Sequence, residues 1–283
     1  MVFIKSLIVA VLAVVAVKAN VLQQSSRTPA ACAYVLPNIP GGFSQRRFAD
    51  FSSNTPSDNP ATVLGTYNIG ISNYGPVPST PLTHTFVPEN VAFGNGYLGL
   101  KTSAYASGSV QSGEIVTNDV FMYASVRTVL KSTATPGIVE GNFFYLDVAT
   151  GAQEIDFEIL TTTIFSSNNP LVPPGIWATN YNNTGSRINT VSTIPFTFDP
   201  RTDYHEYRID SFFQWFGTTT NFYIDGVRVA QHAEPSTTPT VPGHWIWNSW
   251  SSGDVNWSMG PPTADGIYQI RSIDLYTGYT STC

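Results

Sequence analysis

Three acidic residues alternate with large apolar residues in one short stretch of the chain, and this pattern restricts the local fold to an extended strand. Charged residues make up only 11% of the sequence, yet Glu154, Asp156 and Glu158 occupy every second position within the segment 153–160. Successive side chains of a strand point to opposite faces, so the three carboxyl groups share one face. The apolar residues between them share the other, and we expect a strand with one buried and one acidic face.

The acidic face is locally unfavourable unless a reaction uses it. Acids are depleted in strands, and three like charges repel one another. A retaining glycosidase needs one carboxylate as nucleophile and one carboxylic acid as proton donor, with the two groups about 5–5.5 Å apart. Repulsion raises one of the two pKa values and so separates the roles. The competing interpretation is a solvated strand face that is merely acidic.

The spacing of the outer two acids adds a constraint on the sheet. On a flat strand the Cα atoms of Glu154 and Glu158 would lie roughly 13 Å apart, at about 3.3 Å per residue. Their carboxyl groups can reach one sugar only if they lean together across a curved surface. The motif therefore predicts a concave, strongly curved sheet.

The remainder of the chain predicts an all-β domain. It contains no internal repeat and no helix longer than about two turns. The Asp225-Gly226 pair predicts a two-residue hairpin turn. Many short strands separated by turn residues imply a β-sandwich whose concave face carries the acids. We expect loops over 52–60 and 72–81, and strands over 119–130, 142–148, 177–181, 187–198, 204–213, 244–250 and 267–276.

The N-terminus predicts export. After Lys5, an apolar run of eleven residues extends over 7–17, followed by small residues that fit signal-peptidase cleavage before Asn20. Such a run is too short to span a bilayer, and an uncleaved anchor is the less favoured alternative. We expect a signal peptide over 1–19, an N-terminal arm over 20–42, a catalytic domain over 43–283, and a secreted, extracellular protein.

Charge and cysteine content indicate the partners and the compartment. Removal of residues 1–19 deletes Lys5 and Lys18 and no acid, which changes the formal net charge from −6 to −8. This balance argues against nucleic acid and anionic membranes as partners and fits a neutral polysaccharide. Cys32 and Cys283 are the two cysteines, and in an oxidising compartment we expect a disulfide between them. Two free thiols are the alternative.

No sequence pattern predicts a metal or another cofactor. The four histidines are scattered, and no H-E-x-x-H pair occurs. A structural calcium ion held by carbonyl groups and aspartates remains an alternative. Asn182 and Asn256 each begin an N-glycosylation pattern.

Candidate sugar-binding residues combine flat rings with polar groups, as polysaccharide recognition requires. On a strand that ends at Trp250, Asn248 shares its face, and we assign both to the cleft. Trp245 and Trp247 point the other way and are expected in the core. Trp257, in a Gly-bearing loop, is expected as a platform on the cleft rim.

Two further polar residues are candidates with equally plausible structural roles. His205 could hydrogen-bond the acid strand or a sugar hydroxyl, or it could be a satisfied structural histidine. Asn180, beside Tyr181, is a similar candidate.

The sequence resembles a fungal-type member of glycoside hydrolase family 16, which contains laminarinases, lichenases and transglycosylases. The family signature E-I-D-x-E occurs at 154–158. Further matching stretches follow in the family's order and together span about 43–283: Asp50-Phe51, Gly141 to Tyr145, Trp177 to Tyr181, His205 to Tyr207, Phe222 to Gly226, and Trp250 to Asp254 through Trp257.

The resemblance implies a role for each matched residue. It implies that Glu154 is the nucleophile, Glu158 the general acid/base and Asp156 the residue that hydrogen-bonds between them. The implied fold is a jelly-roll sandwich similar to concanavalin A, with retention of anomeric configuration. Sugar stacking is implied for Trp250 and Trp257, and a position lining the cleft for Asn180, His205 and Asn248.

Two departures from the family pattern concern packing and substrate. Ser211 stands where many members have a tryptophan. The five-residue signature lacks the extra residue of bulged, laminarinase-like members, which places the chain nearer to lichenases and transglycosylases.

The prediction from sequence is a monomeric, secreted, retaining endo-β-glucanase that hydrolyses internal bonds of β-1,3 and/or β-1,3-1,4 glucan without a cofactor. A cell-wall glucan/chitin transglycosylase differs from it only in the acceptor and stays open as an alternative. A non-catalytic, lectin-like sandwich that binds glycans on the same face is the alternative from another class.

Overall fold

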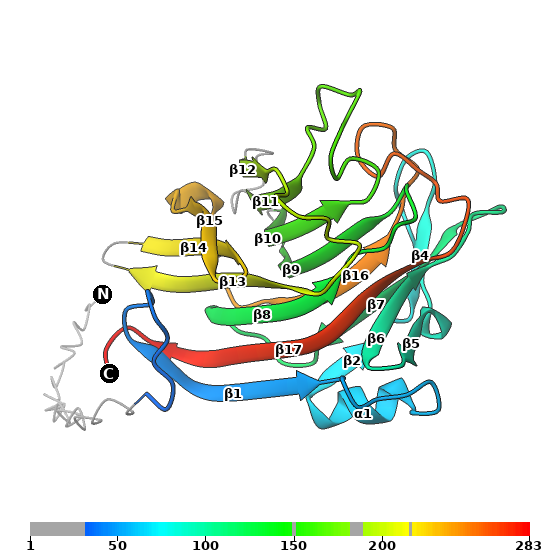
Figure 1. Cartoon of the computed structure of the whole chain (residues 1–283). Helices are drawn as coiled ribbons and strands as arrows, with labels where there is room; N and C mark the ends of the chain where they lie inside the picture. Colours follow the sequence, from blue (N-terminus) through cyan, green and yellow to red (C-terminus); the bar gives the residue numbers. More distant parts are fainter. Residues whose placement is uncertain (1–31, 149–150, 182–188, 215–216) are drawn as a thin grey trace, which may run out of the picture.

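Two large β-sheets packed face to face make up most of the molecule (Figure 1). The computed structural model describes residues 32–148, 151–181, 189–214 and 217–283. Within these ranges strands follow one another with few helical segments: α1 (Pro60–Thr66), η1 (Pro88–Asn90) and η2 (Pro235–Thr237). The expected all-β sandwich is confirmed.

The first sheet has eight strands: β1 (Gly42–Asp50), β5 (Val91–Gly94), β6 (Tyr97–Thr102), β8 (Ala124–Lys131), β13 (His205–Gln214), β14 (Gly217–Ile224), β15 (Val227–His232) and β17 (Gly266–Thr280). Their spatial order is β15-β14-β13-β8-β17-β6-β5, and β1 also pairs with β17. The turn between β14 and β15 is the expected Asp225-Gly226 hairpin, with positive φ at both residues (47° and 77°).

The second sheet has nine strands: β2 (Ile69–Ile71), β3 (Tyr74–Val77), β4 (His84–Phe86), β7 (Val110–Thr117), β9 (Val139–Val148), β10 (Gly151–Leu160), β11 (Ile176–Tyr181), β12 (Asn189–Ile194) and β16 (His244–Trp250). Their order is β12-β11-β10-β9-β16-β7-β4-β3, and β2 also pairs with β7. The segment 153–160 therefore lies inside a sheet, with β9 and β11 as its neighbours.

The main hydrophobic core lies between the two sheets and receives one face of β10. Ile155, Phe157 and Ile159 are only 1–2% exposed. The ring of Phe157 packs edge-on against Tyr207 and Phe222 of the opposite sheet, with centroids 6.0 and 5.3 Å away. Because these apolar side chains fix one face of the strand in the core, the three acids must emerge on the other face.

The tryptophans expected in the core are there. Trp245 and Trp247 on β16 are 1% and 0% exposed. Their indole N–H groups donate to Asn142 Oδ1 at 2.6 Å and to Thr128 Oγ1 at 2.8 Å, so neither polar atom is left unpaired by burial.

The sheets are curved, as the spacing of the acids requires. Figure 1 shows both sheets bending in the same direction, with β4 and β7 rising at one side. The loops after β10 and β16 rise on the free side of the nine-stranded sheet (green and orange in Figure 1). They contact each other through Asn169 Nδ2, which donates to the carbonyl of Val255 at 3.1 Å.

Several element boundaries differ from the prediction. The expected loop 72–81 contains β3, a strand at the edge of the sheet. An edge strand tolerates Pro76, because one of its sides has no neighbouring strand to which a backbone N–H must donate. The strand expected over 119–130 begins only at Ala124. The strand expected over 187–198 is observed as the shorter β12, and 187–188 lie outside the described residues.

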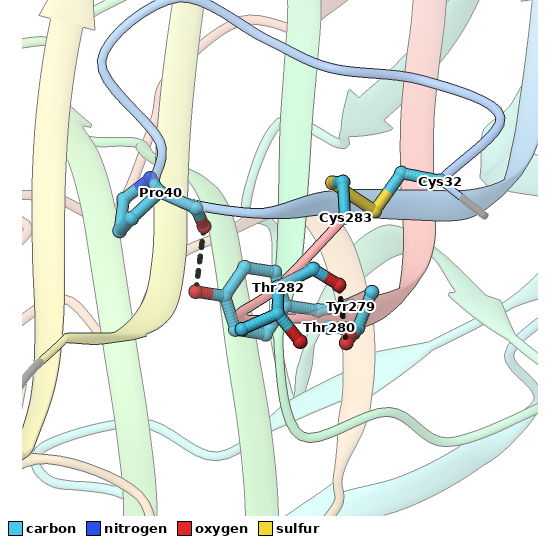
Figure 2. Close-up of a disulfide and its surroundings, with 6 residues drawn as sticks. All are labelled: Cys32, Pro40, Tyr279, Thr280, Thr282 and Cys283. Atoms are coloured by element: carbon cyan, nitrogen blue, oxygen red, sulfur yellow. Dashed lines mark hydrogen bonds between the residues drawn. A yellow bond between two sulfur atoms is a disulfide. The ribbon is translucent and has the colours of Figure 1, made fainter. Parts of the chain in front are cut away.

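The two ends of the described chain are joined by the expected disulfide, Cys32–Cys283, with Cα atoms 5.3 Å apart (Figure 2). The Tyr279 hydroxyl donates to the Pro40 carbonyl at 2.8 Å beside it. These contacts fasten the described part of the N-terminal arm to the end of β17.

The predicted signal peptide, 1–19, and the first part of the arm lie outside the described residues. Among the residues that are described, no helix has the length and apolarity needed to cross a membrane.

Candidate active site

The face of β10 opposite the core forms one wall of a cavity of about 310 Å³. Glu154 and Glu158 both line it. The cavity extends across β9 and β16 to β7 and the β3–β4 hairpin, where Glu114, His84 and Tyr74 form the other wall. Two carboxyl groups four residues apart thus face one hollow. This is the arrangement for which the sequence predicted a curved sheet.

Burial dominates the electrostatics of the two glutamates. It raises the pKa of Glu158 to about 8, and the charge of Glu154 adds to the shift. Burial also raises the pKa of Glu154, to about 7, although a hydrogen-bonding interaction with Asp156 opposes this shift. Of the two glutamates, Glu158 has the higher pKa, and Asp156 favours the charged form of Glu154.

Asp156 lies between the two glutamates and is 2% exposed. Its pKa is raised by burial first, and then by the charges of Glu154 and Glu158. Its Oδ2 atom has no hydrogen-bond partner among the described residues. A protonated Asp156 can donate to a glutamate carboxylate, which gives this buried acid a role despite its unfavourable position.

Strands β9 and β11 place aromatic rings beside the acids. Tyr145 on β9 pairs with Glu154 on β10, and the Tyr145 hydroxyl donates to Asp147 Oδ1 at 2.8 Å. Trp177 pairs with Glu158 across β11. Burial and the charges of the three acids raise the pKa of Tyr181, so its hydroxyl stays protonated and can donate.

The far wall holds an acid that sequence reasoning missed. Glu114 on β7 is 3% exposed and lines the cavity. It accepts hydrogen bonds from Ser72 Oγ at 2.6 Å, Tyr74 OH at 3.1 Å and Asn248 Nδ2 at 3.2 Å. The sequence did contain a signal for Glu114: it is an acid within a strand of otherwise uncharged residues. The same kind of signal identified the segment 153–160.

Asn248 and Trp250 lie where the pattern of β16 puts them, on the cavity side. Asn248 Oδ1 is buried and has no hydrogen-bond partner among the described residues. Trp250 packs against His84, with ring centroids 4.8 Å apart. Trp257 does not line the cavity itself, but packs edge-on against Trp177 at 4.9 Å, next to the Glu158 end of the acid row.

The expectation that Asn180 lines the cleft needs correction. Asn180 pairs with Ile155, whose side chain is in the core, so Asn180 shares that inward face. It is 0% exposed, donates to Thr220 Oγ1 at 3.1 Å and bonds His232 Nδ1 at 3.0 Å, both in the opposite sheet. Asn180 therefore links the two sheets.

His205 also lies away from the cavity, because β13 belongs to the eight-stranded sheet. Its Nδ1 contacts Asp225 Oδ2 at 2.7 Å, and its ring stacks on Phe198 with centroids 3.7 Å apart. This is the structural role that the sequence left open for it: it holds the β14–β15 turn.

Among the described residues no group of three or more His, Cys, Asp or Glu side chains is arranged to hold a metal ion. Of the two glycosylation patterns, Asn182 lies outside the described residues, and Asn256 is on the exposed surface of the loop after β16. Its modification stays a prediction.

Comparisons with solved structures show the same fold in other proteins. The "Bacillus licheniformis beta-glucanase" superposes with a TM-score of 0.63 at 18% identity, covering 82% of this chain and 97% of that one. The endo-1,3-beta-glucanase from Streptomyces sioyaensis gives 0.62 at 17%, covering 86% and 100%. Beta-agarase A from Zobellia galactanivorans gives 0.62 at 16%, covering 82% and 90%.

Comparison with curated protein sequences finds no match. Residues 79–268, more than half of the chain, match the sequence profile of glycosyl hydrolases family 16. The matched range contains the acid strand and most of the cavity lining. On this match, the chain belongs to glycosyl hydrolases family 16 and is a glycoside hydrolase.

Proposed function

We propose that the protein is a secreted, retaining endo-β-glucanase that hydrolyses internal β-1,3 and/or β-1,3-1,4 bonds by double displacement. The observation that carries this proposal is that Glu154 and Glu158 line one cavity from the same strand, with Asp156 buried between them. The glucanases among proteins of similar fold support a β-glucan as the substrate.

In the first step the Glu154 carboxylate attacks the anomeric carbon while Glu158 donates its proton to the departing glycosidic oxygen. One bond forms from carbon to the Glu154 oxygen as the bond to the leaving group breaks. In the second step Glu158, now a carboxylate, takes a proton from water. The water oxygen bonds to the anomeric carbon and displaces Glu154, which restores both residues and retains the configuration.

The electrostatics fit these roles. Burial and the neighbouring charge raise the pKa of Glu158 to about 8, as a proton donor at neutral pH requires. Asp156 interacts with Glu154 and stabilises its charged form, as a nucleophile requires.

The dimensions of the cavity support a polymeric substrate. Three strands, β9, β16 and β7, separate β10 from the β4 wall. At about 4.8 Å per strand spacing, the cleft floor is roughly 19 Å wide, more than a single sugar needs. Secretion is supported by the Cys32–Cys283 disulfide, because such bonds persist in oxidising compartments.

Substitution of the two glutamates tests the proposal. We expect Glu154→Gln and Glu158→Gln each to lower kcat on barley β-glucan or laminarin by at least about 10²–10⁴-fold. The exposed Glu89→Gln serves as a matched control that removes an acid outside the cavity. Unchanged turnover in either cavity variant would refute the assignment.

The leaving group distinguishes the two roles. An aryl β-glucoside with a highly acidic phenol needs no protonation, so Glu158→Gln should recover much of the first step on it. Glu154→Gln should not, because no nucleophile remains. The first-formed product, followed by NMR, should be the β-anomer, and an initial α-anomer would exclude retention. Products longer than the donor would indicate transfer to a sugar.

A further inference from the structure

The wall of the cavity opposite the acids is built by the β3–β4 hairpin, which contributes a histidine to the cavity. The His84 ring packs on Trp250, with centroids 4.8 Å apart and planes inclined by 36°. The His84 and Phe86 rings also pack against each other, with centroids 5.3 Å apart and planes inclined by 83°. Although only 7% exposed, His84 lines the cavity. The ring is thus held firmly while one edge remains in contact with the hollow.

The hydrogen bonds behind the ring fix its tautomer. Ser79 Oγ lies 2.5 Å from the carbonyl oxygen of Leu82 and 3.2 Å from His84 Nδ1. A carbonyl oxygen only accepts, so the single hydroxyl proton of Ser79 is donated to Leu82. Ser79 Oγ must then accept from His84, which places the histidine proton on Nδ1. In a neutral ring Nε2 is consequently left with a lone pair.

We propose that His84 Nε2 accepts a hydrogen bond from a hydroxyl group of the β-linked glucosyl unit that packs on Trp250, and so determines which sugar binds at this part of the cleft. The inference rests on the proposed glucanase function. It assigns to this chain a hydrogen-bond acceptor for substrate on β4, a strand that was not predicted from the sequence.

The surroundings of the ring favour an acceptor over a cation. Burial lowers the pKa of His84 to about 4, so the ring is neutral over most of the range in which such an enzyme works. The acid on this wall, Glu114, is engaged by Ser72, Tyr74 and Asn248 and forms no ion pair with His84 among the described residues.

The distance from the acids predicts which kinetic parameter responds. Three strands lie between β4 and β10, so the sugar at His84 is a different unit from the one attacked by Glu154. A hydrogen bond to that other unit is made in the ground state and in the transition state alike. Its loss should therefore raise KM and leave kcat nearly unchanged.

The first experiment compares His84→Phe with His84→Gln on one glucan oligosaccharide. Phenylalanine keeps the ring contact with Trp250 and removes the acceptor, and KM should rise about tenfold with kcat within about twofold. Glutamine restores an acceptor oxygen and should recover part of the loss. Thermal unfolding of both variants checks that the hairpin still folds.

The second experiment changes the substrate, so its main result, measured on the wild-type enzyme, does not depend on whether a variant folds. In a series of monodeoxyfluoro oligosaccharides, fluorine replaces one hydroxyl at a time and cannot donate a hydrogen bond. One position should cost wild-type enzyme about tenfold in kcat/KM and cost His84→Phe almost nothing. This lack of additivity identifies the partner hydroxyl.

The inference is overturned if His84→Phe leaves KM unchanged, or if every fluorinated position costs the wild type and the variant equally. Failure of the glucanase proposal is distinguishable, because wild-type enzyme would then cleave none of the unmodified oligosaccharides. If His84→Phe lowers kcat as much as Glu158→Gln does, the inference about His84 is also overturned, because that result places His84 at the reacting bond.

Discussion

Burial and the charge of Glu154 raise the pKa of Glu158 from 4.5 to about 8. Between these two values the folded protein holds a proton that the unfolded chain has released, so stability falls as the pH rises through this range. Glu158→Gln removes the effect. We expect the variant to gain stability relative to wild type as the pH rises from 4.5 to 8, by on the order of 1–3 kcal/mol.

Urea unfolding of both proteins at pH 4.5 and pH 8 measures this gain, with Glu89→Gln as the exposed control. If wild type and Glu158→Gln differ in unfolding free energy by the same amount at both pH values, the Glu158 carboxyl group is not buried in its protonated form. At the residue scale, the acid that the reaction needs is also a source of instability.

At the scale of the element, strand β9 carries a glycine where β10 and β16 converge. Gly141 pairs with Glu158 on one side and with Asn248 on the other. A Cβ atom at this position would lie 2.7 Å from Asn248 Oδ1 and 3.1 Å from Phe143 Cδ1. The glycine therefore leaves the space that the Asn248 amide occupies.

We expect Gly141→Ala to displace Asn248 and lower kcat/KM about tenfold or more, with a loss of stability of about 1–3 kcal/mol from the forced contact. Gly65→Ala is the matched control, because a Cβ there meets nothing within 4 Å. In helix α1 that change should stabilise by about 0.5–1 kcal/mol and leave activity intact. Steady-state kinetics and thermal unfolding measure both, and equal effects of the two changes would contradict the role given to Gly141.

At the scale of the whole molecule, the Cys32–Cys283 disulfide links positions 251 residues apart. Around it a small apolar cluster of Ile39, Phe43, Phe212 and Tyr276 fastens the N-terminal arm to the eight-stranded sheet. The acids belong to the other sheet. The cross-link therefore acts on the stability of the folded chain and not on the geometry of the cavity.

We expect Cys32→Ser combined with Cys283→Ser to lose about 2–5 kcal/mol of unfolding free energy, because the unfolded chain gains freedom. Below its unfolding temperature the double variant should keep its kcat/KM. The single Cys283→Ser variant with Cys32 alkylated controls for the free thiol. A loss of activity at temperatures where the circular dichroism spectrum is native would show that the cavity depends on the cross-link.

The sequence determined those features that depend on the local period of the backbone. Alternation alone put Glu154, Asp156 and Glu158 on one face of a strand and their apolar neighbours on the other. The same rule separated Asn248 and Trp250 from the buried Trp245 and Trp247. Asp225-Gly226 specified its own turn, because a two-residue hairpin needs positive φ at both positions.

The tertiary structure decided what depends on which strands become neighbours. In 177–181 neither face is uniformly apolar, so only the pairing of Asn180 with Ile155 directs that amide into the core. His205 is separated from the acids because β13 joins the other sheet. Glu114 and His84 reach the cavity only through the order β10-β9-β16-β7-β4, which brings them to the same hollow as Glu154, a residue much later in the chain. No local pattern encodes that order, since it results from burying both sheets in one core.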